Sequence, residues 1–182
     1  MPAPEIGLLS LGDCLADPVG GGRPTPAERH RAIVESAVLA EGLGFDSVWL
    51  GEHHFCDYVL SAPPVVLAAI AARTSRLRLG TGVTLLANLA PVRVAEDYAT
   101  LDGISNGRAE LVAGRGILAD TYDAFGQKPD ESRERFRENV ELLRRLWTET
   151  EIRWSGRFRA PLERVTVEPR PVQQPHPPLW IG

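Results

Sequence analysis

Apolar residues occur along the chain in two alternating patterns, short continuous runs and longer stretches with helical spacing. The short runs predict β-strands, and the stretches between them predict helices that bury one face. Residues 120–130 show no clear helical pattern, and 154–178 is predicted to be an ordered extended loop that packs on the domain. The predicted strands are 6–11, 45–50, 77–86, 109–113 and 178–182, and the predicted helices are 26–43, 61–74, 91–104 and a segment carrying Phe136, Val140, Leu143 and Trp147.

Local signals mark where several of these helices begin or end. Thr25-Pro26-Ala27-Glu28 has the form of a capping box with proline in the first turn, so a helix is predicted to begin there. Gly44 is suited to end this helix, and Ser61 to begin the next one. Asn106-Gly107 is predicted to supply a turn with positive backbone dihedral angles.

Strands that alternate with helices indicate an α/β fold with a parallel sheet, either doubly wound or closed into a barrel. Periodicity does not choose between these two forms. A closed barrel of eight βα units needs roughly 250 residues, whereas this chain of 182 residues has about four and a half units. Half a barrel would leave the apolar inner face of its sheet open to water. We therefore expect the isolated chain to associate or to fold poorly.

Composition and charge exclude several classes of protein. With 43% hydrophobic and 24% charged residues, the chain has enough apolar side chains for one globular core. Its net charge of -4 provides no general attraction to nucleic acid or anionic lipid. The longest apolar stretch, 62–72, is too short to span a bilayer, and neither the N-terminus nor the two cysteines suggest export. We expect a cytoplasmic protein with no nucleic-acid partner and no membrane segment.

Gly51-Glu52-His53-His54-Phe55 is the first candidate for chemistry, because it lies where the predicted second strand ends. α/β proteins build their sites at this edge of the sheet. Three ionisable groups in a row either form hydrogen bonds within a polar cleft or lie exposed at the end of the strand. A metal site that includes Cys56 is disfavoured, because neighbouring side chains of an extended strand point to opposite faces. No metal is expected.

Three further motifs each have a structural and a functional interpretation. Gly80-Thr81-Gly82 lies inside a strand, where glycine permits the close approach of a packed neighbour or of a flat ligand. Gly114-Arg115-Gly116 follows the predicted fourth strand and either presents a fixed cation to an anion or forms an ordinary salt bridge. Gly103-Ile104-Ser105-Asn106-Gly107 matches a hydrolase nucleophile pattern, but it ends a helix, so a turn is expected instead.

Taken in order along the chain, these segments resemble the bacterial luciferase-like family of flavin-dependent monooxygenases. The resemblance covers essentially the whole chain, and it implies a TIM-type (β/α)8 barrel whose carboxyl-end loops hold a reduced flavin. Because family members are roughly twice as long, residues 1–182 would be the N-terminal portion of a single barrel domain, with the C-terminal half absent. The segments that carry the resemblance are 43–55, 79–83, 91–108, 114–116 and 169–182.

The resemblance also implies roles for individual residues. His53 matches the histidine proposed as the catalytic base, and Glu52 matches a carboxylate near the flavin. Gly82-Val83 falls where the family has a non-proline cis peptide under the flavin ring. Arg115 matches the arginine that binds the flavin phosphate, and Ile117 matches a position whose backbone faces the ring.

The implied activity is a monooxygenation with reduced FMN and O2, in which a flavin C4a-hydroperoxide attacks an aldehyde or another small organic substrate. The implied partners are a separate flavin reductase, which supplies reduced FMN, and a second copy of the chain in a homodimer. Two alternatives remain, an oxidoreductase that uses the deazaflavin F420 on a related barrel and a truncated, non-catalytic flavin-binding subunit. In each case the cofactor supplies the chemistry, and the protein binds it and excludes water.

Overall fold

The structure is a computed structural model that describes residues 4–182. Its centre is a parallel sheet of five strands in the order β1-β2-β3-β4-β7. The order never reverses, which is the arrangement of a barrel wall and not of a doubly wound sheet. The predicted α/β fold with parallel strands is confirmed. The strands are β1 (Gly7–Ser10), β2 (Ser47–Leu50), β3 (Arg78–Leu85), β4 (Ala109–Gly114) and β7 (Leu179–Ile181).

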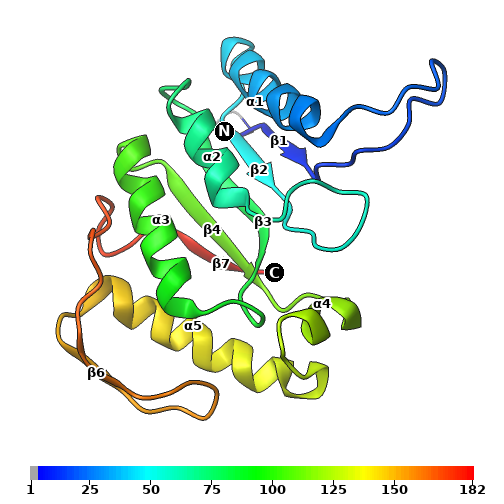
Figure 1. Cartoon of the computed structure of the whole chain (residues 1–182). Coiled ribbons are helices and arrows are strands. Elements are labelled where there is room, and N and C mark those ends of the chain that lie inside the picture. The colour runs from blue at the N-terminus through cyan, green and yellow to red at the C-terminus, as the bar shows by residue number, and fades with distance from the viewer. Residues whose placement is uncertain (1–3) are drawn as a thin grey trace.

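Four helices cover one face of this sheet, as Figure 1 shows. They pack side by side in the order α1, α2, α3, α5. The core lies between these helices and the strands and includes Leu50, Leu67, Leu111 and Trp147, all 1% exposed or less. Within residues 4–182, none of the helices has the length and apolar character needed to cross a bilayer. The helices are α1 (Pro26–Gly42), α2 (Pro63–Ala71), α3 (Pro91–Ser105) and α5 (Ser132–Thr148).

Three of the predicted helix ends are confirmed and one is wrong. Gly44 follows the last turn of α1 with φ of +89°, the left-handed conformation that ends a helix. The Glu28 amide donates to Thr25 Oγ1 at 3.3 Å, and the Glu28 carboxylate accepts from the Thr25 amide at 2.8 Å, so the capping box forms. Asn106 ends α3 in the left-handed conformation, with φ of 56°. Ser61 does not cap α2, which starts at Pro63 without any capping side chain. Proline has no amide hydrogen, so fewer donors there need a cap.

Two segments form regular secondary structure that the sequence pattern did not predict. The first contains a short helix, α4 (Ala119–Ala124), and a 3-10 turn, η1 (Pro129–Glu131). Among its residues α4 buries only Thr121 and Tyr122, which is too few to show a helical period. The predicted extended loop instead contains an antiparallel hairpin of β5 (Ile152–Trp154) and β6 (Leu162–Val165). These strands are too short for an alternating pattern to stand out.

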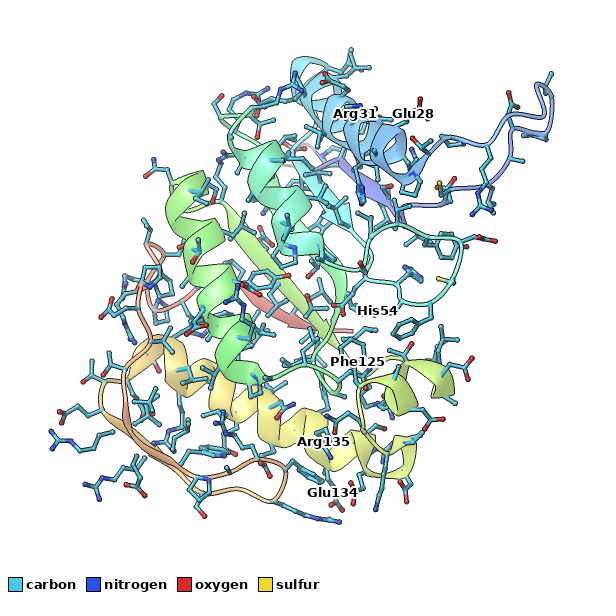
Figure 2. The ribbon with its side chains drawn as sticks, in the orientation of Figure 1. Glu28, Arg31, His54, Phe125, Glu134 and Arg135 are labelled. Atoms are coloured by element: carbon cyan, nitrogen blue, oxygen red, sulfur yellow. The ribbon has the colours of Figure 1, made fainter. Side chains whose placement is uncertain are left out.

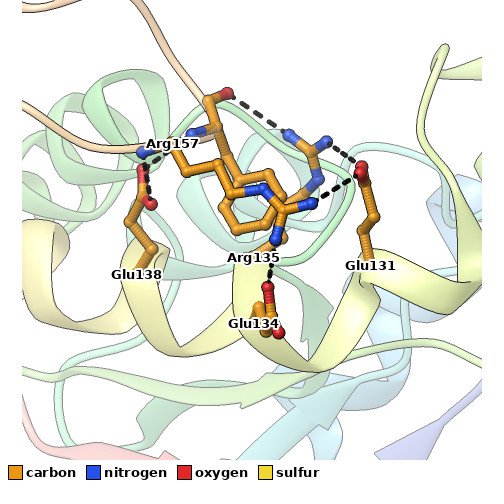
Figure 3. A network of polar contacts seen from close by, with 6 residues as sticks. Glu131, Glu134, Arg135, Glu138 and Arg157 are labelled. Atoms are coloured by element: carbon orange, nitrogen blue, oxygen red, sulfur yellow. Dashed lines mark hydrogen bonds and ion pairs between the residues drawn. The ribbon is translucent and has the colours of Figure 1, made fainter.

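The hairpin is attached to α5 by a cluster of charged and aromatic side chains (Figure 3). The Phe158 ring lies between two guanidinium groups, those of Arg135 at 4.5 Å and Arg157 at 4.9 Å from its centroid. Glu138 accepts hydrogen bonds from the amides of Arg157 at 2.8 Å and Phe158 at 3.1 Å. These contacts join distant parts of the sequence, so no local pattern predicts them. Arg157 also forms ion pairs with Glu131 and Glu134.

The second face of the sheet carries no helix within the described residues, and several of its apolar side chains are open to solvent. Leu9 is 58% exposed and Trp180 is 54% exposed. A hollow of about 530 Å³ on this face is lined by these two residues together with Trp49 and Val112, and the ion-paired side chains of Glu5, Arg78 and Glu110 line it as well. The Trp49 indole lies across Gly80, where a Cβ atom would approach its ring to 2.2 Å, so the packed-neighbour interpretation holds for this glycine. The expected open inner face is confirmed.

One carboxylate connects the end of α1 to the turn before β3. Glu41 accepts hydrogen bonds from the amides of Ser75, Arg76 and Leu77 at 2.7 to 3.0 Å. Partial burial acts to raise the pKa of Glu41, but the amides of Arg76, Leu77 and Ser75 outweigh it and lower this pKa to about 2. The ionised carboxylate therefore stabilises the turn.

Glu41→Gln should destabilise the protein at neutral pH and have little effect in acid. The pKa of about 2 in the folded state lies below the ordinary value of 4.5, so the stabilisation is complete above the ordinary pKa and is lost as the pH falls towards 2. We expect a loss of about 1 kcal/mol in the free energy of unfolding at pH 7, measured by urea denaturation. Glu163→Gln, at a more exposed ion pair, is the control. An equal loss at pH 7 and pH 2.5 would contradict this prediction.

The open sheet face predicts that the chain self-associates or binds an apolar dye, because contiguous exposed apolar surface favours both. Leu9→Gln should reduce association and dye fluorescence while the circular dichroism spectrum stays unchanged. Ile104→Gln is the control, since Ile104 is 52% exposed near the end of α3, away from this sheet face. The measurements are size exclusion with light scattering and ANS fluorescence. A wild-type chain that stays monomeric, binds no dye and melts in one sharp transition would argue against the prediction.

Candidate functional site

A cavity of about 620 Å³ lies at the carboxyl ends of the strands. This is the edge at which parallel α/β sheets bind their ligands. The cavity is bounded by the loop after β2, the end of β3, the loop after β4, and α4. The structure brings together all six residues that the sequence predicted for the site. They are Glu52, His53, Gly82, Val83, Arg115 and Ile117.

Glu52 connects the loop after β2 to the end of β3. One of its carboxylate oxygens lies 2.7 Å from Nε2 of His54, and the other accepts the amide hydrogen of Leu85 at 3.0 Å. Glu52 is 6% exposed, and a carboxylate buried to this extent needs such partners. His54 in turn packs edge-on against Phe125, which follows α4, with 4.9 Å between ring centroids (Figure 2). Glu52 and His54 thus join three of the segments that bound the cavity.

His53 has a less constrained ring than His54. Its Nδ1 lies 3.4 Å from the Gly51 carbonyl, a long contact, and its ring lies against that of Tyr58 with 4.7 Å between centroids. No group within residues 4–182 forms a hydrogen bond with Nε2 of His53. Nε2 of His54, in contrast, is held by Glu52. His53 is therefore the histidine of this pair that can exchange a proton with a ligand at Nε2.

The wall formed by the end of β3 contains Gly82, Val83 and Leu85. The Gly82-Val83 peptide is cis, as the resemblance implied, and the pairing of β3 with β4 shifts between Gly82 and Thr84. Behind this irregular segment the hydroxyls of Thr81, Thr84 and Tyr98 lie 2.7 to 2.9 Å from one another. Burial raises the pKa of Tyr98, so its hydroxyl stays neutral. The three buried hydroxyls satisfy one another and hold the strand where its pairing shifts.

The Gly114-Arg115-Gly116 loop forms the adjacent wall, because β4 pairs directly with β3. A Cβ atom at Gly114 would lie 2.5 Å from Cγ2 of Val83, so glycine permits the two walls to approach. The Arg115 guanidinium donates to Oγ of Ser132 at 3.3 Å and has no carboxylate within ion-pair distance among residues 4–182. The ordinary salt bridge considered for Arg115 is therefore not found in the described part of the chain. Ile117 projects into solvent with 93% of its surface exposed.

The serine motif at the end of α3 has a structural role. Ser105 is 2% exposed, donates to the Asp102 carbonyl at 3.2 Å and accepts from the Arg108 amide at 3.1 Å. It therefore shapes the turn into β4, as the sequence predicted, and is not an accessible nucleophile. Among the residues that the structure describes, no three His, Cys, Asp or Glu side chains are grouped to hold a metal ion.

One residue that shapes the site was not among those predicted from the sequence. The Tyr122 hydroxyl, from α4, donates to the backbone carbonyl of Arg115 and lies 3.2 Å from that of Gly116. No local signal could have identified it, because α4 has no visible period and the contact depends on how the chain folds back. His54 lay within the motif noted in the sequence, but its pairing with Glu52 could not be inferred from alternation along a strand.

A flat cofactor with an anionic group fits this cavity. Cofactor sites typically have volumes of about 300 to 1,000 Å³ and apolar walls with few polar groups. The backbone at Gly82 and Val83 offers a wall without a long side chain, and Arg115 offers a cation that has no carboxylate partner in residues 4–182. Arg115 suits the phosphate of FMN, because guanidinium binds phosphate through paired hydrogen bonds. The residues present are therefore compatible with the predicted flavin.

Known proteins are similar to this chain in fold and in sequence. The crystal structure of the monooxygenase RslO1 from Streptomyces bottropensis matches with a TM-score of 0.89 and 38% identity, covering 98% of this chain and 53% of that one. The oxygenase component of a flavin-dependent trigonelline monooxygenase from Acinetobacter baylyi is 29% identical, covering 87% of this chain and 44% of its own length. An F420-dependent glucose-6-phosphate dehydrogenase from Amycolatopsis mediterranei is 36% identical, covering 70% of this chain and 41% of its own.

This chain therefore spans less than half the length of these two curated relatives. Its five consecutive parallel strands form the corresponding part of a TIM-type barrel, about four and a half βα units. The profile of the family described as luciferase-like monooxygenases matches residues 10–182. Fold, site and sequence agree, and the chain belongs to the luciferase-like monooxygenase family.

Proposed function

We propose that this chain is the N-terminal part of an FMN-dependent monooxygenase, and that residues 1–182 form the first half of a single barrel domain. One observation carries the proposal: three features line the same cavity. They are the wall at Gly82 and Val83, a cation and a histidine Nε2, the last two without a carboxylate partner and a hydrogen-bond partner, respectively, in residues 4–182. A flavin monooxygenase needs a surface for the ring, a counter-charge for the phosphate and a group that moves protons.

Arg115 would hold the phosphate, and the backbone of Gly82, Val83 and Ile117 would lie against the ring. Among residues 4–182 Arg115 has only the Ser132 hydroxyl as a side-chain partner, so a phosphate would be its first counter-charge. Glu52 would act indirectly, since both of its oxygens already have partners. Its proposed role is to keep the end of β3 in place beside the ring.

Bound reduced FMN supplies the two electrons with which O2 is activated, so that one oxygen atom enters the substrate and the other leaves as water. His53 would hold or accept a proton at Nε2, within the cavity that the reacting groups share. The buried Glu52–His54 pair and the aromatic contact of His54 with Phe125 close one side of this cavity and limit the entry of water.

An aldehyde or another small organic molecule is the proposed substrate class. A second cavity of about 620 Å³ lies beside the first, on the side of the loop that precedes α1. Four residues, His53, His54, Cys56 and Tyr58, line both cavities. A substrate bound in the second cavity would therefore lie beside His53, which also lines the first cavity, where the flavin is proposed to bind.

Two partners follow from this proposal. The first is a flavin reductase that delivers reduced FMN in the cytoplasm, since the trigonelline relative is itself named as an oxygenase component. The second is another copy of the chain, as a homodimer. Apolar side chains on α1, directly after it and on α2 support an interface there, with Leu39, Leu43 and Val65 at 62%, 69% and 71% exposure.

The F420-dependent relative favours a second candidate function, an F420-dependent oxidoreductase. The wall at Gly82 and Val83 carries no polar side chain that would distinguish one ring from the other, so it suits a deazaflavin as well as FMN. Oxygen consumption with reduced FMN and an aldehyde would support the monooxygenase. Turnover of F420 without oxygen uptake would support the alternative, and stoichiometric flavin binding without either reaction would indicate a non-catalytic flavin-binding subunit.

Arg115→Ala should weaken FMN binding much more than riboflavin binding, because riboflavin lacks the phosphate. One charge-assisted contact is worth about 1.5 to 3 kcal/mol, so we expect the dissociation constant of FMN to rise by about 10- to 100-fold. Flavin fluorescence titration measures both ligands. Arg153→Ala, on the exposed hairpin, is the control and should change neither. Equal losses for FMN and riboflavin would show that Arg115 does not bind the phosphate.

His53→Ala should retain flavin binding and lower substrate turnover by about 100- to 10,000-fold, the usual contribution of a general acid or base. The assay supplies reduced FMN and measures the carboxylic acid formed from an aldehyde, with oxygen uptake recorded in parallel. His176→Ala is the matched control, since His176 stacks on Trp147 and is absent from the residues that line either cavity. Full turnover by His53→Ala would remove His53 from the mechanism.

A further inference from the structure

Tyr122 reaches from α4 to the loop that carries Arg115. Its hydroxyl donates to the Arg115 carbonyl and lies 3.2 Å from the Gly116 carbonyl, and its side chain is almost completely buried, at 3% exposure. Tyr122 does not line the cavity. Any effect on a ligand in the cavity must therefore pass through the loop.

The loop needs an anchor, because glycines flank Arg115 on both sides. Gly116 has φ of +79°, a conformation that glycine adopts freely, and glycine leaves the backbone many competing conformations. The Arg115 side chain is itself weakly held, by one contact of 3.3 Å to the Ser132 hydroxyl. Within residues 4–182, the Tyr122 hydroxyl is the side-chain group that fixes the backbone carbonyls of this loop.

We propose that Tyr122 is a positioning residue for anion binding, which fixes the backbone of residues 115–116 so that the Arg115 guanidinium is held ready for the phosphate of the cofactor. This inference rests on the proposed function, in which Arg115 binds that phosphate. It assigns to α4 a role in selecting phosphorylated over unphosphorylated flavin. The ring-facing wall is not involved, because a separate group of hydroxyls around Tyr98 supports β3.

The experiment compares FMN with riboflavin in wild type and Tyr122→Phe by fluorescence titration of the full 182-residue chain. Phenylalanine keeps the buried ring and removes only the hydroxyl. We expect FMN binding to weaken by about fivefold to tenfold, the effect of losing one hydrogen bond, with riboflavin binding changed less than about twofold. If Tyr122 were only structural, both ligands would lose affinity equally or neither would, and either result would overturn the proposal.

A double variant tests whether Tyr122 acts through Arg115. In an Arg115→Ala background, Tyr122→Phe should have no further effect on FMN, because the group it positions is absent. Independent, additive losses would refute the inference. Tyr98→Phe is the matched control, since it also removes a buried hydroxyl but on the β3 wall, and it should affect FMN and riboflavin alike. Thermal melting establishes that each variant is folded.

A measurement without flavin separates failure of this inference from failure of the proposed function. The side-chain Nε–H resonance of Arg115, assigned by its loss in Arg115→Lys, reports how rigidly the guanidinium is held. We expect a lower order parameter in Tyr122→Phe than in wild type. If the wild-type chain binds FMN no more tightly than riboflavin, the proposed phosphate contact is wrong. The order parameter of this resonance then remains as the test of whether Tyr122 positions Arg115. An unchanged order parameter would then overturn the inference.

Discussion

The parallel pairing of consecutive strands is the constraint on which the rest of this structure depends. Because β1, β2, β3, β4 and β7 all run in one direction, their carboxyl ends meet at one edge, and the loops that follow them face a common cavity. The same pairing requires cover on both faces of the sheet. Helices cover one face, and the other exposes Leu9 and Trp180, so the residues described here form a wall of a barrel and not a closed one.

The cavity is shaped largely by side chains that stand behind its walls. Thr81, Thr84 and Tyr98 hold β3 where its pairing shifts, and Tyr122 holds the loop after β4. Each is buried and polar, and each has partners, because an unpaired buried hydroxyl would cost stability. These buried contacts hold the end of β3 and the loop after β4 in the positions from which their residues line the cavity.

The sequence predicted the parts of the fold that have strong local patterns. The core strands and the helices that bury one face were identified, and so was the capping box at Thr25, because apolar period and hydrogen-bonding side chains act within a few residues. Their order then placed Glu52, His53 and Arg115 just after the carboxyl ends of β2 and β4. Alternation of the elements could not choose between a barrel and a doubly wound sheet. The unbroken strand order in the structure makes that choice.

The sequence by itself thus determined the order of the elements, the chemistry available at the ends of the strands and the resemblance to a family. Only the tertiary structure decided which groups pair across the chain. Glu52 with His54 and Leu85, Tyr122 with the Arg115 loop, and Glu138 with the hairpin are all contacts of this kind. Buried polar groups and helix-anchored loops must find whatever partner the packed chain brings near. Which partner each group finds depends on distances in the folded structure, and local periodicity carries no information about those distances.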